Sequence, residues 1–307
     1  MGAKLVLTGV TGSKSGGVLV EYIAENIEKI NTMFPGGIRI IARETSNTEK
    51  VENLLPEAEI KRGSFQDRVF MTESLKDADT VIHVAGIHWS RGLVDAAVEN
   101  HVRRLILIHT TGIYSKYKAA GEEYRQTDAY VEEQCKRAGI VLTILRPTMI
   151  YGNVHDQNVV KFIKMVDKLP IMPVVRGARY ELQPVHYKDL GKAYFDVLVN
   201  EAATAGKNYN LSGGEVIQLR DMLKVIGKDL GKKEVRFVNF PFWFGYSLAW
   251  GLYCLTFGKI DYRERVQRLC EPRVYSHNEA SRDFGYKPRT FQEAIVGEVK
   301  EYQELKH

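Results

Sequence analysis

Cysteine is scarce in this chain of 307 residues. The three cysteines, Cys135, Cys254 and Cys270, are odd in number and far apart in the sequence. This spacing excludes a disulfide framework and the paired Cys ligands of a zinc site, and His83 and His88 show no metal-ligand spacing either, so no metal is expected. Free thiols are typical of a reducing compartment, which favours a cytoplasmic location.

A strong excess of one charge is also missing. The chain has 43 Lys and Arg residues against 38 Asp and Glu residues, a net charge of +5. In a protein of this size, such an excess favours small anionic ligands or lipid headgroups and does not predict a nucleic-acid-binding surface. With 44% hydrophobic and 26% charged residues, the composition is that of a folded globular protein.

Long uncharged runs are represented by a single aromatic-rich segment, residues 237–258. Its length is near the roughly 20 residues that cross a bilayer. Pro241 and several small or polar residues argue against a membrane span. We expect a buried helix or the wall of a substrate pocket, and peripheral contact with a membrane surface is the alternative.

The first half of the chain alternates between short apolar runs and amphipathic segments. Strands are expected at residues 4–7, 37–42, 58–63, 80–85, 104–109 and 141–145, and helices at 18–30, 48–55, 93–100 and 122–138. This order predicts a Rossmann-type α/β fold, a doubly wound parallel sheet with helices on both faces. We therefore expect a Rossmann domain at 1–152 and a smaller α/β lobe at 153–307, interleaved with the first and not independent of it.

Glycines gather where the first expected strand ends. The sequence there is Thr8-Gly9-Val10-Thr11-Gly12-Ser13-Lys14-Ser15-Gly16-Gly17, and a helical pattern follows. Glycine lets the backbone turn tightly and approach a pyrophosphate, and the helix N-terminus offers free N–H groups. Because the turn joins a strand to a helix at the start of a β/α series, it predicts a nucleotide phosphate site.

The same turn resembles the Thr-Gly-x-x-Gly-x-x-Gly opening of the extended and atypical short-chain dehydrogenase/reductases, the NAD-dependent epimerase/dehydratase family. Gly9 and Gly12 match this pattern, while the third glycine, Gly16, comes one position late and Ser15 stands in its place. The resemblance continues over nearly the whole chain, through residues 78–86, 145–152, 184–190, 208–214 and 284–288.

The resemblance implies an NAD(P)-binding oxidoreductase or isomerase that transfers a hydride reversibly to or from a nucleotide sugar or a similar hydroxyl or carbonyl compound. It implies cofactor contacts from Gly9, Thr11, Gly12, Ser13, Ser15, Gly16, Arg43, Ser64, Ala85, Gly86 and Pro147. Arg43 ends the second strand, where its guanidinium could pair with a 2′-phosphate, so NADP is favoured. Glu44 beside it leaves NAD open.

Catalysis in the family uses a Ser or Thr, a Tyr, and a Lys four residues after that Tyr. Thr111 fits the first position, with Thr110 as its neighbour. Tyr114 and Lys118 satisfy the Tyr–Lys spacing, but they lie directly after a strand, where the family has a structural turn. Tyr124 lies on the expected helix, where the family keeps this pair, yet Asp128 replaces the Lys. An aspartate there would raise the pKa of Tyr124, and it could not donate a hydrogen bond to the ribose.

Substrate contacts are expected from the second half, where relatives hold a nucleotide diphosphate. The matching residues are Asn153, Arg179 and Arg273. The absence of the Lys leaves a second hypothesis open, a non-catalytic NAD(P)-binding sensor or scaffold, acting in solution or at a membrane surface. The resemblance is also compatible with a homodimer that forms through the helices at 93–100 and 122–138.

Overall fold

The computed structural model describes residues 2–117, 119–256, 263–269 and 271–306. Its centre is a sheet of seven parallel strands in the order β11-β6-β5-β4-β1-β2-β3. The strands are β1 (Lys4–Thr8), β2 (Ile38–Ala42), β3 (Glu59–Arg62), β4 (Ala78–His83), β5 (Arg104–Ile108), β6 (Val141–Pro147) and β11 (Asn208–Leu211). Every residue of β2 and β5 is buried, as expected of strands covered on both faces.

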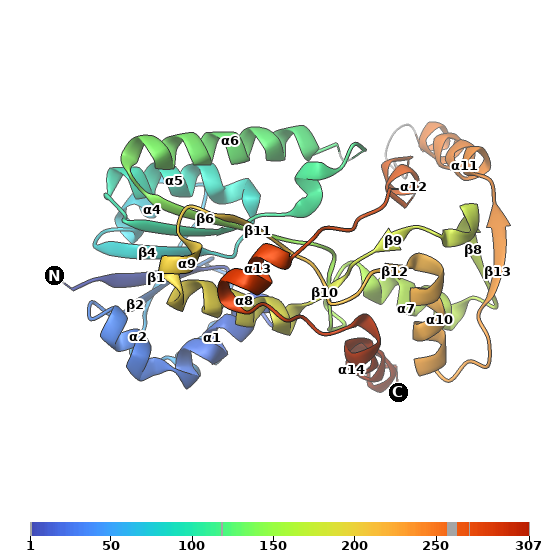
Figure 1. The fold of residues 1–307 in the computed structure, drawn as a ribbon, viewed down its shortest axis with the longest axis horizontal. Coiled ribbons are helices and arrows are strands. Elements are labelled where there is room, and N and C mark those ends of the chain that lie inside the picture. The colour runs from blue at the N-terminus through green and yellow to red at the C-terminus, as the bar shows by residue number, and fades with distance from the viewer. Residues whose placement is uncertain (1, 118, 257–262, 270, 307) are drawn as a thin grey trace.

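Helices cover both faces of this sheet (Figure 1). One face carries α1 (Ser15–Glu25), α2 (Ile27–Met33) and α8 (Tyr187–Val199), and the other carries α4 (Arg68–Ser74), α5 (Ser90–Glu99) and α6 (Gly121–Ala138). Three further helices are α3 (Glu49–Leu54), α9 (Glu201–Thr204) and α13 (Asn278–Phe284), and two short 3₁₀ segments are η1 (Ile87–Trp89) and η2 (Thr111–Tyr114). The predicted Rossmann-type fold is therefore confirmed.

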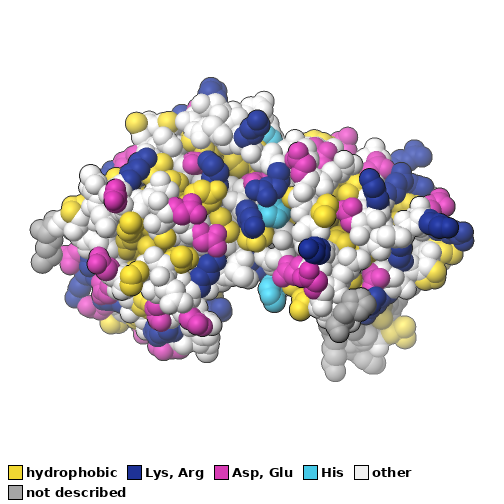
Figure 2. All heavy atoms as spheres, turned by 90° about the horizontal axis from the view of Figure 1, so that it is seen from below, with side chains coloured by type: hydrophobic (Ala, Val, Ile, Leu, Met, Phe, Trp, Pro, Cys, Tyr) yellow, Lys and Arg dark blue, Asp and Glu magenta, His cyan; other side chains and the backbone are white. Residues whose placement is uncertain are grey.

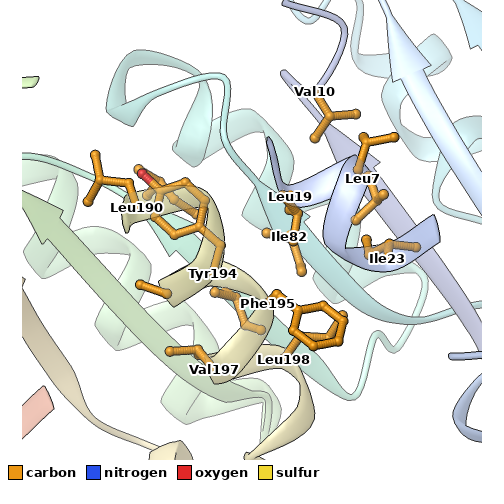
Figure 3. Close-up of a cluster of buried hydrophobic side chains, with 14 of the residues drawn as sticks. Leu7, Val10, Leu19, Ile23, Ile82, Leu190, Tyr194, Phe195, Val197 and Leu198 are labelled. Carbon is orange, nitrogen blue, oxygen red and sulfur yellow. The ribbon is translucent and has the colours of Figure 1, made fainter. Parts of the chain in front are cut away.

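The largest core cluster lies between α1, α8 and the sheet. In Figure 3, Leu190 and Tyr194 of α8 lie near Leu19 of α1 and Ile82 of β4. Most of these side chains have no exposed surface. Because α8 and β11 come from the second half of the chain, that half contributes directly to the layer beneath the cofactor turn.

The first expected helix is broken into two. Residues 18–30 form α1 and α2, with Asn26 between them at φ −120°. The Asn26 side-chain amide donates to the carbonyl of Tyr22 at 2.9 Å, a local bond that competes with the helical pattern. The helix α4 was not expected from the sequence. Asp67 starts it by accepting a hydrogen bond from the Phe70 N–H.

The remaining elements form a smaller lobe beside the carboxyl ends of the strands. It contains β7 (Ile150–Tyr151), α7 (Val159–Lys168), β8 (Ile171–Val175), η3 (Arg176–Ala178), β9 (Glu181–Leu182), β10 (Val185–His186), β12 (Ile217–Gln218), α10 (Leu219–Asp229), β13 (Arg236–Phe240), α11 (Phe242–Leu255), α12 (Arg263–Leu269) and α14 (Phe291–Glu304). It has a separate core around Ile163, Met222 and Ile295. Viewed from below, the two lobes meet at a narrower waist (Figure 2).

The aromatic segment differs from its main expectation. It forms β13, then Pro241, then α11 at the outer end of the small lobe (Figure 1). Of the α11 side chains that the structure describes, Ala249 alone is buried, while Trp243 is 67% and Trp250 is 54% exposed. The expectation of a buried helix is therefore wrong for α11. Within the described residues, no helix combines the length and apolarity needed to cross a membrane.

Candidate functional site: a cofactor cleft and an adjoining polar cleft

The glycine-rich turn after β1 has no room for a side chain at Gly9 and Gly16, nor at Gly17, where a Cβ would lie 2.2 Å from the Gly12 carbonyl oxygen. Gly9 has φ +71°, and a Cβ there would lie 2.4 Å from the Ala85 nitrogen. A Cβ on Gly16 would lie 2.4 Å from the Gly9 carbonyl oxygen. A Cβ on Gly12, by contrast, would meet no atom within 4 Å. Gly9 and Gly16 therefore fix the shape of the turn, while Gly12 leaves space on its open side.

This turn forms one wall of a cavity of about 400 Å³. The α1 helix begins at Ser15, and its N-terminus faces the cavity without a side-chain cap from Lys14. Free N–H groups at a helix start are suited to a pyrophosphate. Among the residues predicted for the cofactor, seven line this cavity: Gly9, Gly12, Ser13, Ser15, Gly16, Gly86 and Pro147. It is also lined by Lys14, Val84, Ile108, His109, Ile150 and Tyr194.

The other predicted cofactor residues lie outside that lining. Arg43 is exposed directly after β2, the neighbour of β1, and Ser64 follows β3, the next strand beyond β2. Ala85 is next to Gly9, and Thr11 is half-buried in the turn. Arg43 and Ser64 therefore lie at the carboxyl-terminal ends of the strands, as the phosphate turn does. They belong to β2 and β3, which lie on the opposite side of β1 from β4.

A second cavity of about 460 Å³ adjoins the first, and both are lined by Lys14, Ser15 and Ile150. Most of its lining residues have polar side chains, among them Thr110, Thr111, Asp156, Gln157, Asn158, Gln183, Arg268, Arg273 and Tyr275. Thr111 is buried, and its hydroxyl donates to the Pro147 carbonyl at 3.2 Å. The structure thus places the predicted Thr111 and Arg273 on one cleft, next to the phosphate turn.

Two guanidinium groups in this second cleft are incompletely paired. The Nε atoms of Arg268, on α12, and of Arg273 are buried without a hydrogen-bond partner among the described residues. Burial lowers the pKa of Arg273, and Arg268 nearby adds to that effect. A buried donor without a partner is costly, and an anionic group bound in the cleft would relieve that cost for both residues.

The two tyrosine candidates lie apart. Tyr114 is 46% exposed, its hydroxyl donates to Asn210 Oδ1 at 3.2 Å, and its ring packs on Tyr275. Tyr124 is buried on α6, with its hydroxyl 3.4 Å from His88 Nε2. Neither tyrosine is among the residues that line the two clefts. Lys118 lies outside the described residues.

Burial raises the pKa of Tyr124, and the charge of Glu123 adds to this effect, whereas Arg268 opposes it. The direction agrees with the sequence-based expectation, but the cause differs. Asp128, expected to be responsible, is held by other partners. The positive charge of Arg268, from the polar cleft, partly offsets the rise in the pKa of Tyr124.

Asp128 is the centre of a buried charged network. Its Oδ2 accepts two hydrogen bonds from Arg146, at 2.6 and 3.1 Å, and its Oδ1 lies 2.6 Å from His109 Nδ1. Burial would raise the pKa of Asp128, but the bonds and charges of His109 and Arg146 hold it below the ordinary value. Burial lowers the pKa of His109. Asp128 is therefore ionised and tied to the sheet, where the family would have a lysine reaching the cofactor.

His109 connects this network to the cofactor cleft, which it lines at the end of β5. Since its Nδ1–H donates to the ionised Asp128, its Nε2 is the acceptor for the Ser90 hydroxyl at 2.9 Å. Ser90, His109 and Asp128 are all buried, and of the three His109 alone is among the residues that line the cofactor cleft. Its hydrogen bonds connect the end of β5 to α5 and α6 beside the cleft.

The predicted substrate residues separate into two groups. Arg273 lines the polar cleft, as described above. Asn153 is buried, and its amide donates to the Ser13 carbonyl at 3.4 Å, so it connects the small lobe to the phosphate turn. Arg179 is exposed and outside the residues that line the cleft. Arg268 and His109 were not predicted. A polar residue at the carboxyl end of a buried strand was a signal for His109, whereas the sequence around Arg268 contains no comparable signal.

A buried carboxyl group supports the loop at the mouth of the polar cleft. Glu298 of α14 has no exposed surface and accepts a hydrogen bond from the Gly152 N–H at 2.8 Å. Burial, reinforced by the neighbouring Asp156 carboxylate, raises the pKa of Glu298 to about 10. Asp156 in turn accepts from the N–H groups of Val159 and Val160 at the start of α7. Glu298 is therefore protonated at neutral pH.

Glu298→Gln should make the protein less sensitive to alkaline pH. Between the ordinary pKa of a glutamate and about 10, the unfolded wild type has lost the Glu298 proton while the folded protein keeps it. The free energy of unfolding of the wild type therefore falls as pH rises, by up to about 1.4 kcal/mol per pH unit from this group. Urea unfolding across this pH range should show that the free energy of unfolding of the variant rises relative to that of the wild type as the pH increases. The exposed Glu304→Gln is the control. If the free energy of unfolding had the same pH dependence in Glu298→Gln as in the wild type, Glu298 would not be protonated in the folded protein.

Similarity to known proteins agrees with this geometry. Residues 36–168 match a family model described as NAD(P)H-binding. A UDP-glucuronic acid 4-epimerase from Bacillus cereus, in complex with UDP-glucuronic acid and NAD, superposes with a TM-score of 0.69 at 16% identity, over 98% of this chain and 99% of that chain. The chain has the fold of the NAD-dependent epimerases and dehydratases. The match to the NAD(P)H-binding family model agrees with the predicted NAD(P)-binding character.

Two curated relatives align with part of this epimerase/dehydratase fold. The 2-alkyl-3-oxoalkanoate reductase of Stenotrophomonas maltophilia is 26% identical over 177 residues, 54% of this chain and 53% of the reductase. Subunit 9 of the mitochondrial NADH dehydrogenase (ubiquinone) 1 alpha subcomplex of Arabidopsis thaliana is 26% identical over 121 residues, 39% of this chain and 30% of the subunit. The alignments thus span about half of the first relative and less than a third of the second.

Proposed function

We propose that this protein is an NAD(P)-dependent oxidoreductase or epimerase that transfers a hydride reversibly between the nicotinamide and a hydroxyl or carbonyl carbon of a nucleotide sugar or a similar anionic substrate. The observation that carries the proposal is the junction of the two clefts at Lys14, Ser15 and Ile150. A phosphate turn on one side and a polar cleft with two underpaired arginines on the other fit a cofactor and an anionic substrate side by side.

The described residues supply most of the needed roles. Thr111 lines the polar cleft, where its hydroxyl would turn from the Pro147 carbonyl to donate its one hydrogen bond to the reacting oxygen of the substrate. Arg268 and Arg273 would pair with a phosphate or carboxylate of the substrate. Although Tyr124 is not among the residues that line the two clefts, it is proposed as the acid/base, because Arg268 of the polar cleft opposes the rise of its pKa. Tyr114 is less suited, because its hydroxyl is bonded to Asn210 at the surface.

A panel of UDP- and dTDP-sugars tests this proposal. Each sugar is added to the protein loaded with NADP or NAD, and the absorbance of reduced nicotinamide and the sugar product are followed. We expect turnover with at least one sugar, and a loss of roughly a hundredfold or more in kcat for Thr111→Val and for Tyr124→Phe. Cofactor binding should be unchanged in both variants. Turnover that survives both substitutions would overturn the assigned roles.

NADP is proposed over NAD because Arg43 is exposed at the end of β2 and available to a 2′-phosphate. Arg43→Ala should weaken NADPH binding about tenfold and leave NADH binding unchanged, since one charge-assisted contact is lost. Fluorescence titration of both cofactors measures this. Arg137→Ala, at an exposed position on α6, is the matched control. An equal loss for NADH and NADPH would show that Arg43 does not select the cofactor.

A second function is favoured by one specific observation, the replacement of the family lysine by Asp128. In this alternative the protein binds NAD(P)H as a sensor or scaffold without turnover. The sugar panel separates the two functions. Binding of the reduced cofactor without turnover of any sugar, in the wild type, would favour the sensor.

A further inference from the structure

The outer end of the small lobe presents an apolar stripe on α11. Trp243, Ser247, Trp250 and Cys254 are exposed and follow each other at spacings of four, three and four residues, which places them on one side of the helix. Leu255, 80% exposed, lies beside this stripe. The helix contains no charged residue over its 14 positions.

The opposite side of α11 is the one that packs on the protein. Ala249 is buried, and Phe242, Tyr246 and Tyr253 are half-buried. The neighbouring helix α12 is a main packing partner of α11. The helix α11 is therefore packed on the protein through its inner face, while its outer face exposes two tryptophans. Exposed apolar stripes of this kind are typical of binding surfaces.

Positive charge is concentrated in the same part of the chain. Residues 231–269 contain seven Lys and Arg and three Asp and Glu, so four of the five net positive charges of the protein lie in this stretch. Two arginines contact the aromatic rings of α11 directly: the Arg176 guanidinium is 5.3 Å from the Phe242 ring centroid, and that of Arg263 is 3.8 Å from Tyr253. Arg236 on the preceding strand is exposed.

We propose that α11 docks this protein on the surface of an acidic phospholipid bilayer. Tryptophans suit the headgroup region, because their rings are apolar and their N–H groups can be hydrated. The excess of basic residues in this part of the chain attracts anionic headgroups. A helix with a 14-residue uncharged sequence is too short to span, and lying in the interface is the arrangement that buries its stripe.

The docked helix is next to the substrate cleft. Arg268, which lines the polar cleft, belongs to α12, and α12 packs on α11. Docking would therefore hold the cleft close to the bilayer surface. The surface itself does not depend on the proposed catalytic function, because none of the stripe residues lines either cleft.

Vesicle sedimentation tests the docking with the full chain. Vesicles of phosphatidylglycerol and phosphatidylcholine in equal parts are compared with vesicles of phosphatidylcholine alone. We expect the wild type to bind the mixed vesicles, and to bind them less at high salt. Trp243→Ser/Trp250→Ser should reduce this binding about tenfold or more, through the loss of two large apolar side chains. Arg236→Glu should also reduce it, and more strongly at low salt.

Val69→Ser/Val296→Ser is the matched control, since both valines are exposed on other helices. It should bind like the wild type, and all variants should keep wild-type thermal stability and NADPH binding. No binding of the wild type to mixed vesicles, or equal binding by the tryptophan variant, would overturn the proposal. So would a wild-type dimer that the tryptophan substitutions convert to a monomer, because a second copy would then occupy the stripe.

Discussion

Gly12→Asp should abolish NADPH binding and leave the fold intact. A Cβ at Gly12 meets no atom within 4 Å, so an added side chain is tolerated by the protein itself. The residue lines the cofactor cleft, where the new carboxylate would face the pyrophosphate. The carboxylate and the pyrophosphate are both negative and would repel each other strongly in a partly enclosed site. We expect the affinity for NADPH to fall by about a hundredfold or more. Fluorescence titration with NADPH measures the loss.

Two controls separate this effect from damage to the fold. Gly92→Asp, at an exposed position of α5, also adds a carboxylate where a Cβ meets nothing within 4 Å, and this variant should bind NADPH normally. Gly12→Asp should unfold in urea at the same midpoint as the wild type. Normal NADPH affinity in Gly12→Asp would mean that the cofactor does not use this turn.

Asp128→Asn should destabilise the protein by about 3 kcal/mol or more. The substitution leaves the Arg146 guanidinium, whose side chain is 6% exposed, without its ionised partner in the interior. Removing one member of a buried ion pair costs much more than the pair contributes on its own, because the remaining charge is unsatisfied. Urea unfolding at neutral pH measures the change. The exposed Asp221→Asn on α10 is the matched control and should change stability by less than about 0.5 kcal/mol.

The pH dependence gives a second readout of the same network. Because the pKa of folded Asp128 is below its ordinary value, its contribution is present above that ordinary value and is lost as pH falls through the folded pKa. The wild type should therefore lose stability on acidification more steeply than Asp128→Asn. Asp128→Lys should not restore the Tyr–Lys pair of the family. The new lysine would place a second positive charge against Arg146, and we expect this repulsion to prevent folding. A stable and more active Asp128→Lys protein would contradict the network as described.

The sheet and the phosphate turn were accessible from the sequence because each is a local pattern. Buried parallel strands give continuous apolar runs, and β2 and β5 lie within the expected ranges. Gly9 and Gly16 stand where a side chain cannot fit, and this requirement is visible in the sequence. The break at Asn26 was not, because it depends on a single side-chain bond to the Tyr22 carbonyl.

The polar cleft was only partly predictable, because it is formed by residues far apart in the chain. Arg268 reaches the cleft from α12, more than 150 residues after Thr111, and no short motif connects the two. The contacts of Asp128 also could not be predicted from the sequence, because they depend on tertiary structure. The sequence showed a missing lysine, and the fold shows that Arg146 and His109 hold the carboxylate in place. The exposure of α11 could not follow from composition, since aromatic residues contribute both to cores and to binding surfaces.

The most direct test of the account is a fluorescence titration of the purified wild-type chain with NADPH and with NADH. The central claim is that the turn from Gly9 to Gly16 and the cleft above it hold a dinucleotide. The account predicts saturable binding at one site per chain, with NADPH binding more tightly than NADH. No binding of either cofactor at millimolar concentration would contradict it, and the fold would then be one that has kept its shape without its cofactor.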